Sequence, residues 1–299
     1  MRNVVASTSG LSYRMPTPPE LKSLGNLDSS TVASFGDEWS YFDQSELLPT
    51  ELQRMFDRYF GIFPWDSLPQ HAEGFDMGCG SGRWALLVAP RVGRLNCIDV
   101  SAEALAVARR NLTDLPGVRF FEASVDESSL APASQDFGYS LGVLHHVPDT
   151  QAALDGCVAL LKPGAPFLVY LYYRFDNRPL WFRAIWRASE TLRRRVSRLS
   201  PTPKRYATDA IALLIYWPLA RFAKLCSAAG LPVGALPLSS YRDSSLYTLR
   251  TDSRDRFGTP LEQRFTRDEI LSIMTKSGLT DIVFSDTEPY WCALGRKGA

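Results

Sequence analysis

The segment from Gly74 to Trp84, which reads GFDMGCGSGRW, constrains the fold of this chain more than any other. It places an acid, Asp76, at the end of a short apolar run, then glycine at every second position, then a helical pattern over Arg83–Ala89. Glycine accepts the positive φ of a tight turn and lets backbone N–H groups approach a ligand closely. The start of the following helix adds unpaired N–H groups and the positive end of its dipole. This order of strand, turn and helix is typical of a nucleotide-binding crevice.

Two further apolar runs strengthen the prediction of a nucleotide site. The run Arg94–Val100 contains Asp99, 17 residues after Gly82, and a carboxylate at the end of the next parallel strand can accept both ribose hydroxyls. The run Val118–Asp126 ends where the adenine edge is expected. In a dinucleotide motif, G-x-G-x-x-G, the third glycine would fall at Arg83. The pattern D-x-G-x-G-x-G therefore favours a different adenosine ligand.

Four motifs in order resemble a class I S-adenosylmethionine-dependent methyltransferase, and most closely the group typified by the ubiquinone and menaquinone biosynthesis enzymes. The motifs are Asp76–Gly82, Asp99, Phe137–Asp149 and Leu160–Gly164, and they span roughly residues 73–173. There are two departures from the family pattern. Ala-Ser-Val-Asp follows the third strand where Gly-Asp-Ala is common, and Lys-Pro-Gly-Ala replaces the frequent Lys-Pro-Gly-Gly.

The resemblance implies S-adenosyl-L-methionine as the cofactor. It implies that Asp76 orients the methionine amino group and that Asp99 binds the ribose hydroxyls. The first departure leaves open whether Ser124 or Asp126 holds the adenine amino group. The implied cofactor-binding residues are Asp76, Gly78, Cys79, Gly80, Gly82, Asp99, Val100, Ser124, Val125, Asp126 and Leu141.

Strand and helix patterns alternate from Glu73 to Tyr173, which predicts a parallel sheet with helices on both faces. Helices are expected over residues 83–89, 102–112 and 150–161, with Ser101 as the N-cap of the second. Thr266 and Glu269 form a capping-box pattern that opens another helix. Two strands near residues 282–285 and 290–294 follow. By resemblance we expect a Rossmann-like α/β fold whose seven-stranded sheet ends in an antiparallel hairpin.

Composition divides the chain into four parts. We predict a mobile tail (1–30), an N-terminal lid (31–70), a cofactor-binding core (71–173 and 265–299) and a helical substrate-cap insert (174–264). Within the insert, helices are expected over residues 179–199 and 208–229, followed by a loop. Four aromatic residues, from the lid and the end of the fifth strand, are candidates for the acceptor site: Trp39, Tyr41, Tyr172 and Tyr173. For the two lid residues, an aromatic plug between lid and core is the alternative.

The charges are balanced over the whole chain, with 33 basic and 32 acidic residues, but the insert is strongly basic. Residues 174–264 hold 17 Lys and Arg against 7 Asp and Glu. This asymmetry suggests an anionic partner, or arginines that solvate an apolar helical segment. Docking on an anionic membrane through Trp181, Trp186 and Trp217 is a further alternative. Nucleic acid is disfavoured because the chain shows no recognisable RNA-binding module.

Five scattered cysteines without C-x-x-C spacing indicate reduced thiols and a cytoplasmic location. The first twenty residues contain no apolar signal-peptide core. The longest apolar segment, Ala210–Ala220, has eleven residues, which is too few to span a bilayer. We predict no metal site, because no carboxylate cluster at ligand spacing accompanies the adjacent histidines.

His145 and His146 are the candidates for a catalytic base, since they follow the predicted fourth strand. A neutral imidazole suits removal of a proton from the acceptor. The alternative is that the two histidines only shape the floor of the pocket. Because neighbouring strand residues face opposite ways, we expect at most one to point into the site.

The sequence thus predicts a methyltransferase for a small or medium-sized anionic acceptor, with oxygen favoured over carbon or nitrogen as the methylated atom. A sugar, a lipid-linked compound or a natural-product intermediate would fit. The alternatives are transfer of another group from a modified adenosylmethionine, RNA methylation, and a regulatory protein that binds the cofactor without turnover.

Overall fold

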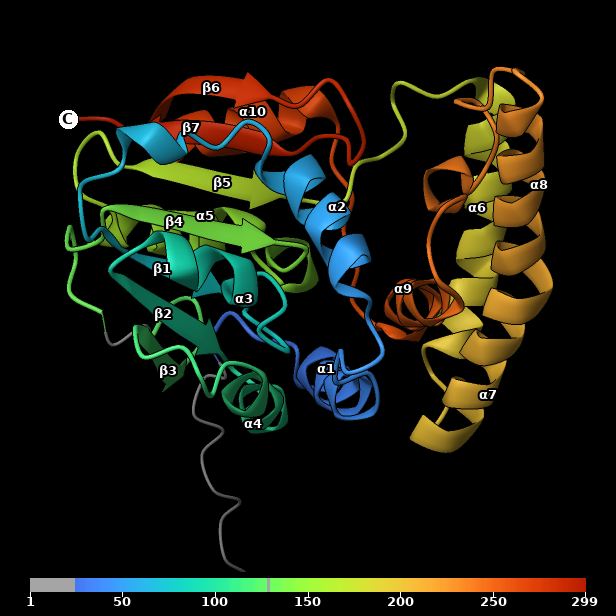
Figure 1. Cartoon of the computed structure of the whole chain (residues 1–299), viewed down its shortest axis with the longest axis horizontal. Coiled ribbons are helices and arrows are strands. Elements are labelled where there is room, and N and C mark those ends of the chain that lie inside the picture. Colours follow the sequence, from blue (N-terminus) through green and yellow to red (C-terminus); the bar gives the residue numbers. More distant parts are fainter. Residues whose placement is uncertain (1–24, 128–129) are drawn as a thin grey trace, which may run out of the picture.

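A computed structural model describes residues 25–127 and 130–299 (Figure 1). Its centre is a seven-stranded sheet in the order β3-β2-β1-β4-β5-β7-β6. The first five strands pair in parallel, and β6 and β7 form the antiparallel end, as predicted. The strands are β1 (Glu73–Met77), β2 (Arg94–Asp99), β3 (Val118–Glu122), β4 (Phe137–Leu141), β5 (Pro166–Tyr170), β6 (Leu279–Phe284) and β7 (Ala293–Lys297).

Helices cover both faces of the sheet. On one face α2, α3 and α4 pack over strand residues such as Leu95 and Tyr139. On the other face α5 and α10 pack over Phe75 and Phe167. The bounds of these elements and of the short turns beside them are α2 (Pro49–Phe60), α3 (Ala85–Val88), η2 (Ala89–Arg91), α4 (Ala102–Asn111), η3 (Leu144–His146), α5 (Thr150–Leu160) and α10 (Arg267–Lys276).

The predicted helix caps are present. The Ser101 side chain accepts a hydrogen bond from the backbone N–H of Ala104 at the start of α4. At the start of α10, Thr266 and Glu269 bond to each other's backbone N–H groups as a capping box. Such caps satisfy N–H groups that the helix itself leaves unpaired, so they fix where each helix begins.

The N-terminal part begins earlier than predicted. Helix α1 (Ser29–Tyr41) includes the last residues of the expected tail, and the 3₁₀ turn η1 (Trp65–Ser67) follows α2. The Asp28 carboxylate accepts from Thr31 N at 2.8 Å and caps α1. The polar run around Ser29 hid this start, because it has no apolar period. Most of the predicted tail, residues 1–24, lies outside the described residues.

The chain leaves the core after Tyr173 and returns at Phe265, where these two residues form an isolated parallel bridge. Between them lie α6 (Leu180–Val196), α7 (Pro201–Ile211), the π-helical turn η4 (Ala212–Tyr216), α8 (Trp217–Ala228), the 3₁₀ turn η5 (Ser239–Tyr241) and α9 (Leu246–Gly258). The second helix therefore starts at Pro201, not at residue 208. Helix α9 was predicted as loop, because its buried side chains include Thr251, Arg254 and Arg256 and show no apolar pattern.

Elements α7, η4 and α8 form one continuous helix, Pro201–Ala228. Its 28 residues and a window of mean hydropathy 1.3 make it long and apolar enough to cross a membrane. Ala210–Ala220, the longest uninterrupted apolar run, has eleven residues, and from it the sequence predicts no segment long enough to span a bilayer. This prediction was wrong, because the helix continues past both ends of that run. Just 28 % of that window is buried in the protein.

Candidate functional site

A glycine turn joins β1 to the segment before α3. Gly78, Gly80 and Gly82 have φ values of +76°, +53° and +77°, which residues with side chains rarely adopt. The Asp99 carboxylate, at the end of β2, accepts from the backbone N–H of Gly80 at 2.8 Å and of Ser101 at 2.9 Å. These bonds hold the acid beside the turn, although burial raises the pKa of Asp99.

Close neighbours also demand glycine in this turn. A Cβ atom at Gly78 would lie 2.4 Å from the Val143 side chain, and one at Gly80 would lie 3.0 Å from Trp39 Nε1. Trp39 belongs to α1, so the N-terminal helix reaches over the turn. The turn, α1 and the segment after β4 therefore enclose one volume.

Three buried side-chain oxygens beside the turn have no partner among the described residues: Oδ2 of Asp76, Oγ of Ser81 and Oγ of Ser124. Burial raises the pKa of Asp76 to about 8. Buried polar groups are normally paired, so such atoms are expected where a ligand supplies the partner. An ammonium group suits Asp76 and a hydrogen-bonding ring edge suits Ser124. These residues therefore fit S-adenosylmethionine, whose methionine and adenine parts present such groups.

A cavity of about 530 Å³ runs from the glycine turn to the insert. Twelve of the predicted site residues line it: Trp39, Gly78, Cys79, Gly80, Asp99, Val100, Ser124, Val125, Leu141, His146, Tyr172 and Tyr173. Five others are not among its lining residues: Tyr41, Asp76, Gly82, Asp126 and His145. Tyr41 instead lies 40 % exposed, with its hydroxyl bonded to Arg250 and its ring under Arg205.

The two histidines lie in η3, just beyond β4, so the strand alternation used to separate them does not apply there. His145 is fully buried, and its ring stacks on Tyr172 with the centroids 3.9 Å apart. Neither of its ring nitrogens has a partner among the described residues, and burial lowers its pKa well below the usual range. Only His146 of the pair faces the cavity.

The tautomer of His146 follows from its contacts. Its Nδ1 lies 2.7 Å from the carbonyl oxygen of Leu261, which can only accept, so Nδ1 carries the proton. The lone pair is then on Nε2, which lies 3.8 Å from Asp255 Oδ1. The hydroxyl of Tyr172 donates to the other oxygen of Asp255. Burial lowers the pKa of His146 to about 4 and raises that of Asp255 to about 6.

Five acids outside the Rossmann-like motifs line the cavity and were not predicted from the sequence: Asp28, Glu38, Asp252, Asp255 and Glu288. Asp252 and Asp255 come from α9, and Glu38 comes from α1. Burial raises the pKa of Glu38 well above its usual range, and both of its carboxylate oxygens lack a partner within the described chain. Nothing in the linear sequence places the acids of α1 and α9 opposite His146, because these helices are separate in the chain and α9 has no apolar period.

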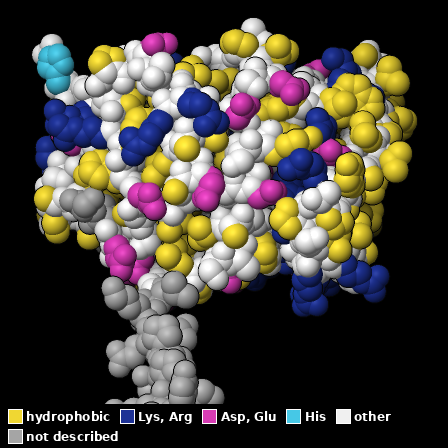
Figure 2. Space-filling model, turned by 90° about the horizontal axis from the view of Figure 1, so that it is seen from below, with side chains coloured by type: hydrophobic (Ala, Val, Ile, Leu, Met, Phe, Trp, Pro, Cys, Tyr) yellow, Lys and Arg dark blue, Asp and Glu magenta, His cyan; other side chains and the backbone are white. Residues whose placement is uncertain are grey.

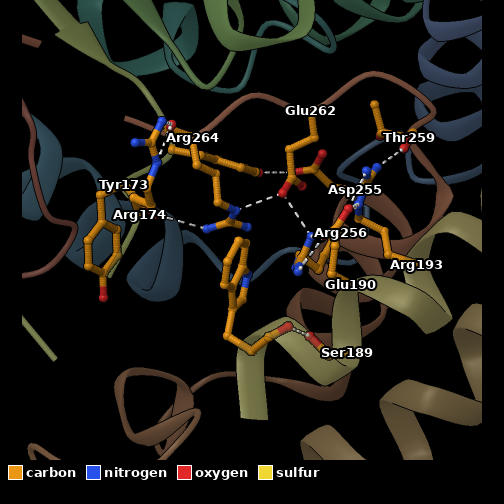
Figure 3. A network of polar contacts seen from close by, with 12 residues as sticks. Tyr173, Arg174, Ser189, Glu190, Arg193, Asp255, Arg256, Thr259, Glu262 and Arg264 are labelled. Carbon is orange, nitrogen blue, oxygen red and sulfur yellow. Dashed lines mark hydrogen bonds and ion pairs between the residues drawn. The ribbon is translucent and has the colours of Figure 1, made fainter. Parts of the chain in front are cut away.

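A buried ion network holds the parts of the insert together beside the core (Figure 3). Glu262 pairs with Arg256 and with Arg264, at 2.8 and 2.7 Å. Glu190 of α6 pairs with Arg193 and Arg256 at 2.7 and 3.4 Å. Although burial opposes it, the two arginines lower the pKa of Glu262. The network therefore uses internally several of the cations that made the insert basic.

The described residues contain no group of three or more His, Cys, Asp and Glu side chains placed to hold a metal ion. The cavity offers acid–base groups and polar side chains beside the cofactor cradle.

Comparison with known proteins agrees with this geometry. Residues 75–169 match the family model described as a methyltransferase domain. The chain is 28 % identical over 179 residues to a ubiquinone biosynthesis O-methyltransferase of Sodalis glossinidius, covering 56 % of this chain and 68 % of that protein. It is 31 % identical over 136 residues to the protein of the same name from Pectobacterium carotovorum, covering 42 % of this chain and 55 % of that one.

The fold is also that of a solved O-methyltransferase family protein from Burkholderia thailandensis. The TM-score is 0.50 at 14 % identity, covering 90 % of this chain and 60 % of the other. The matched domain ends at residue 169, before the insert begins. With its glycine turn, its Asp99 and its seven-stranded sheet, the chain carries a methyltransferase domain over residues 75–169 that resembles the class I S-adenosylmethionine-dependent enzymes.

Proposed function

We propose that this protein methylates a hydroxyl oxygen of a small or medium-sized acceptor held between the glycine turn and the insert. The observation that carries the proposal is the unpartnered Nε2 of buried His146, which lies in the same cavity as the cofactor cradle. A proton acceptor is needed when a neutral hydroxyl becomes an ether. The names of the O-methyltransferase relatives support oxygen over nitrogen or carbon.

The bound cofactor supplies an electrophilic methyl group on a sulfonium. His146 Nε2 would accept the hydroxyl proton while the acceptor oxygen is methylated. The Asp255 carboxylate, 3.8 Å away, stabilises the imidazolium that forms. Tyr172 and Leu261 hold the acid and the ring in this arrangement. Holding the reacting atoms in line supplies much of the acceleration, up to an effective molarity of ~10⁵ M or more.

The cavity walls favour an acceptor with a polar head and an apolar body. Aromatic and aliphatic side chains of the insert, including Phe182, Ile185 and Leu219, line the end away from the glycine turn. The basic composition of the insert suggested an acceptor with an anionic group. The structure supports this less, because Arg256 and Arg264 of the insert already pair with Glu262. Arg83, whose Nε is buried without a partner in the described chain, is the cation best placed for an anionic group.

The test measures transfer of radiolabelled methyl from S-adenosylmethionine to panels of phenols, sugars, amines and lipid extracts. We expect label on hydroxyl oxygen. Replacing His146 by Gln should lower kcat about 10²–10⁴-fold and leave the cofactor Kd unchanged. His71→Asn is the matched control, since His71 is exposed and His146, like His145, is buried. Label found only on nitrogen or carbon, or an almost unchanged His146→Gln rate, would contradict the proposal.

We also propose a cytoplasmic location. All five cysteines are free thiols, which suits a reducing compartment. Fractionation of expressing cells should recover the protein from the cytoplasm or its membrane surface, and recovery from an extracytoplasmic fraction would refute this.

A further inference from the structure

The insert exposes far more apolar surface than the core does. The most exposed large apolar side chains of its helices include Leu180 at 79 %, Leu214 at 76 % and Leu225 at 70 %. We define the α6–α8 face by six exposed residues: Trp181 and Ile185 of α6, Leu214 of η4, and Trp217, Phe222 and Leu225 of α8. Figure 2 shows hydrophobic side chains gathered over the end of the molecule that the insert forms. Contiguous apolar surface of this kind marks an interaction site.

Most of the charges near this face are positive, and one exposed acid, Asp243, pairs with Lys224. Between Leu180 and Leu231 the chain has ten Lys and Arg and two acids. Both acids form ion pairs within the protein, Glu190 with Arg193 and Asp209 with Arg250. The exposed cations are Arg187, Arg194, Arg195, Arg198 and Lys224. Of these, Arg187, Arg195 and Arg198 form no ion pair with any described residue. The apolar face is therefore bordered by free positive charge, which complements an anionic surface.

The continuous helix Pro201–Ala228 cannot span a bilayer while the insert stays folded. Its inner side is buried, with Ile211, Tyr216 and Ala220 in a cluster that includes Leu249 of α9. Near its start, the Lys204 ammonium bonds to the carbonyl oxygen of Gly258 at 3.0 Å. One side is thus held by protein and the other is apolar and exposed. A helix of this type lies in the plane of the membrane interface.

A second copy of the chain suits the face poorly. In a two-fold dimer the same patch faces itself. The unpaired cations Arg187, Arg195 and Arg198 would then approach their own equivalents, and no exposed acid on these helices offsets the repulsion. Anionic lipid head groups supply the missing negative charge, and Trp181 and Trp217 are of the residue type that anchors proteins at this depth.

We infer that the α6–α8 face docks this protein on an anionic lipid membrane. Three side chains, Ile185, Ile215 and Leu219, are exposed and also line the cavity. The cavity therefore opens toward the face, and the docked protein receives its acceptor from the membrane. This last step rests on the proposed function, whereas docking itself does not.

The test is co-sedimentation of the full chain with vesicles, without cofactor or acceptor, so that loss of methyl transfer would not affect it. The vesicles are phosphatidylcholine alone or with about a third phosphatidylglycerol. We expect binding to the anionic vesicles and at least tenfold weaker binding to the neutral ones. High salt should weaken binding, since exposed charges are screened over about 10 Å at 0.1 M salt.

Two double variants separate the apolar and the charged parts of the face. Leu214→Ser with Leu225→Ser, and Arg195→Gln with Arg198→Gln, should each weaken binding at least tenfold. The matched controls lie outside the insert, where Leu48 of the lid and Arg119 of the core are also exposed. Leu48→Ser and Arg119→Gln should bind as the parent does.

Absence of vesicle binding by the parent chain would overturn the inference. An equal loss of binding in the Leu48→Ser and Arg119→Gln controls would also overturn it. So would a dimer in solution that the Leu214→Ser, Leu225→Ser variant converts to monomer while vesicles bind neither form. Circular dichroism of each variant shows whether it folds. If the leucine variant does not fold, the arginine variant still tests the inference.

Discussion

At the scale of single residues, the chemistry of this protein depends on groups that burial has moved away from their ordinary pKa values. Burial keeps His146 neutral and lowers its pKa to about 4, although the hydrogen bond to the Leu261 carbonyl oxygen acts in the opposite direction. Asp255 places a carboxylate oxygen 3.8 Å from Nε2, and the negative charge of Glu262 also acts on the His146 ring.

The pH profile of kcat should follow Asp255. Its pKa of about 6 means that the carboxylate is ionised above that pH and stabilises an imidazolium on His146. Below pH 6 the acid is neutral and this stabilisation is lost, so the rate should fall as the pH drops. The pKa of His146 is about 4, which is too low to cause a fall in kcat near pH 6. Asp255→Asn should lower kcat and flatten the profile between pH 5 and 7. A variant that keeps the parent's acidic limb would show that another group titrates.

At the scale of elements, ion pairs as well as apolar packing hold the part of the insert that borders the site. Helices α6 and α9 and the segment leading to Phe265 meet at Glu262, which pairs with two arginines. Arg264 also lies 5.0 Å above the Tyr172 ring. The ion network therefore connects the insert to a residue that holds the proposed catalytic pair.

Replacing Glu262 by Gln should destabilise the protein by about 3–5 kcal/mol, because Arg256 and Arg264 would keep buried charges without their partner. Chemical denaturation gives the free energy of unfolding. The control is Lys224→Gln, which breaks the exposed pair with Asp243 in the same insert. An exposed pair contributes about 0–1 kcal/mol, so this control should change little. Similar effects in both variants would show that the Glu262 network does not stabilise the fold.

At the scale of the whole molecule, one cavity joins two parts of different origin. The glycine turn and Asp99 come from the matched methyltransferase domain, whereas Asp252, Asp255 and the apolar wall come from the insert. We therefore propose that the core binds the cofactor and that the insert selects the acceptor. The same insert turns its opposite side to solvent as the α6–α8 face.

S-adenosylmethionine should stabilise the native protein by about 2.7 kcal/mol at a concentration of one hundred times its Kd. NAD at the same concentration should give no such gain, because the turn lacks the third glycine of a dinucleotide motif. Asp99→Ala removes the ribose acceptor at ~1.5–3 kcal/mol per hydroxyl, so its cofactor Kd should rise at least about tenfold. Thermal unfolding and calorimetry measure both effects. Stabilisation by NAD, or an unchanged Kd in the variant, would contradict the assigned site.

Local sequence determined the core. Strands β1–β5, the glycine turn, the N-cap at Ser101 and the capping box at Thr266 could all be predicted, because each depends on residues within a few positions of one another. The cofactor class followed from the same local patterns. Helix α2 was also predictable, since its apolar residues recur at helical spacing along its buried side.

Only the tertiary structure decided the acceptor side of the site. Asp255 lies more than one hundred residues from His146 in the chain, on a helix whose buried side chains are polar, so no period indicates it. The choice of His146 over His145 depends on η3, which turns one ring to the cavity and stacks the other on Tyr172. Likewise, which arginines are free and which leucines are exposed depends on packing between α6, α8 and α9. The physical reason is the same in each case: burial and long-range pairing are properties of the folded arrangement, and neighbouring residues in the chain do not encode them locally.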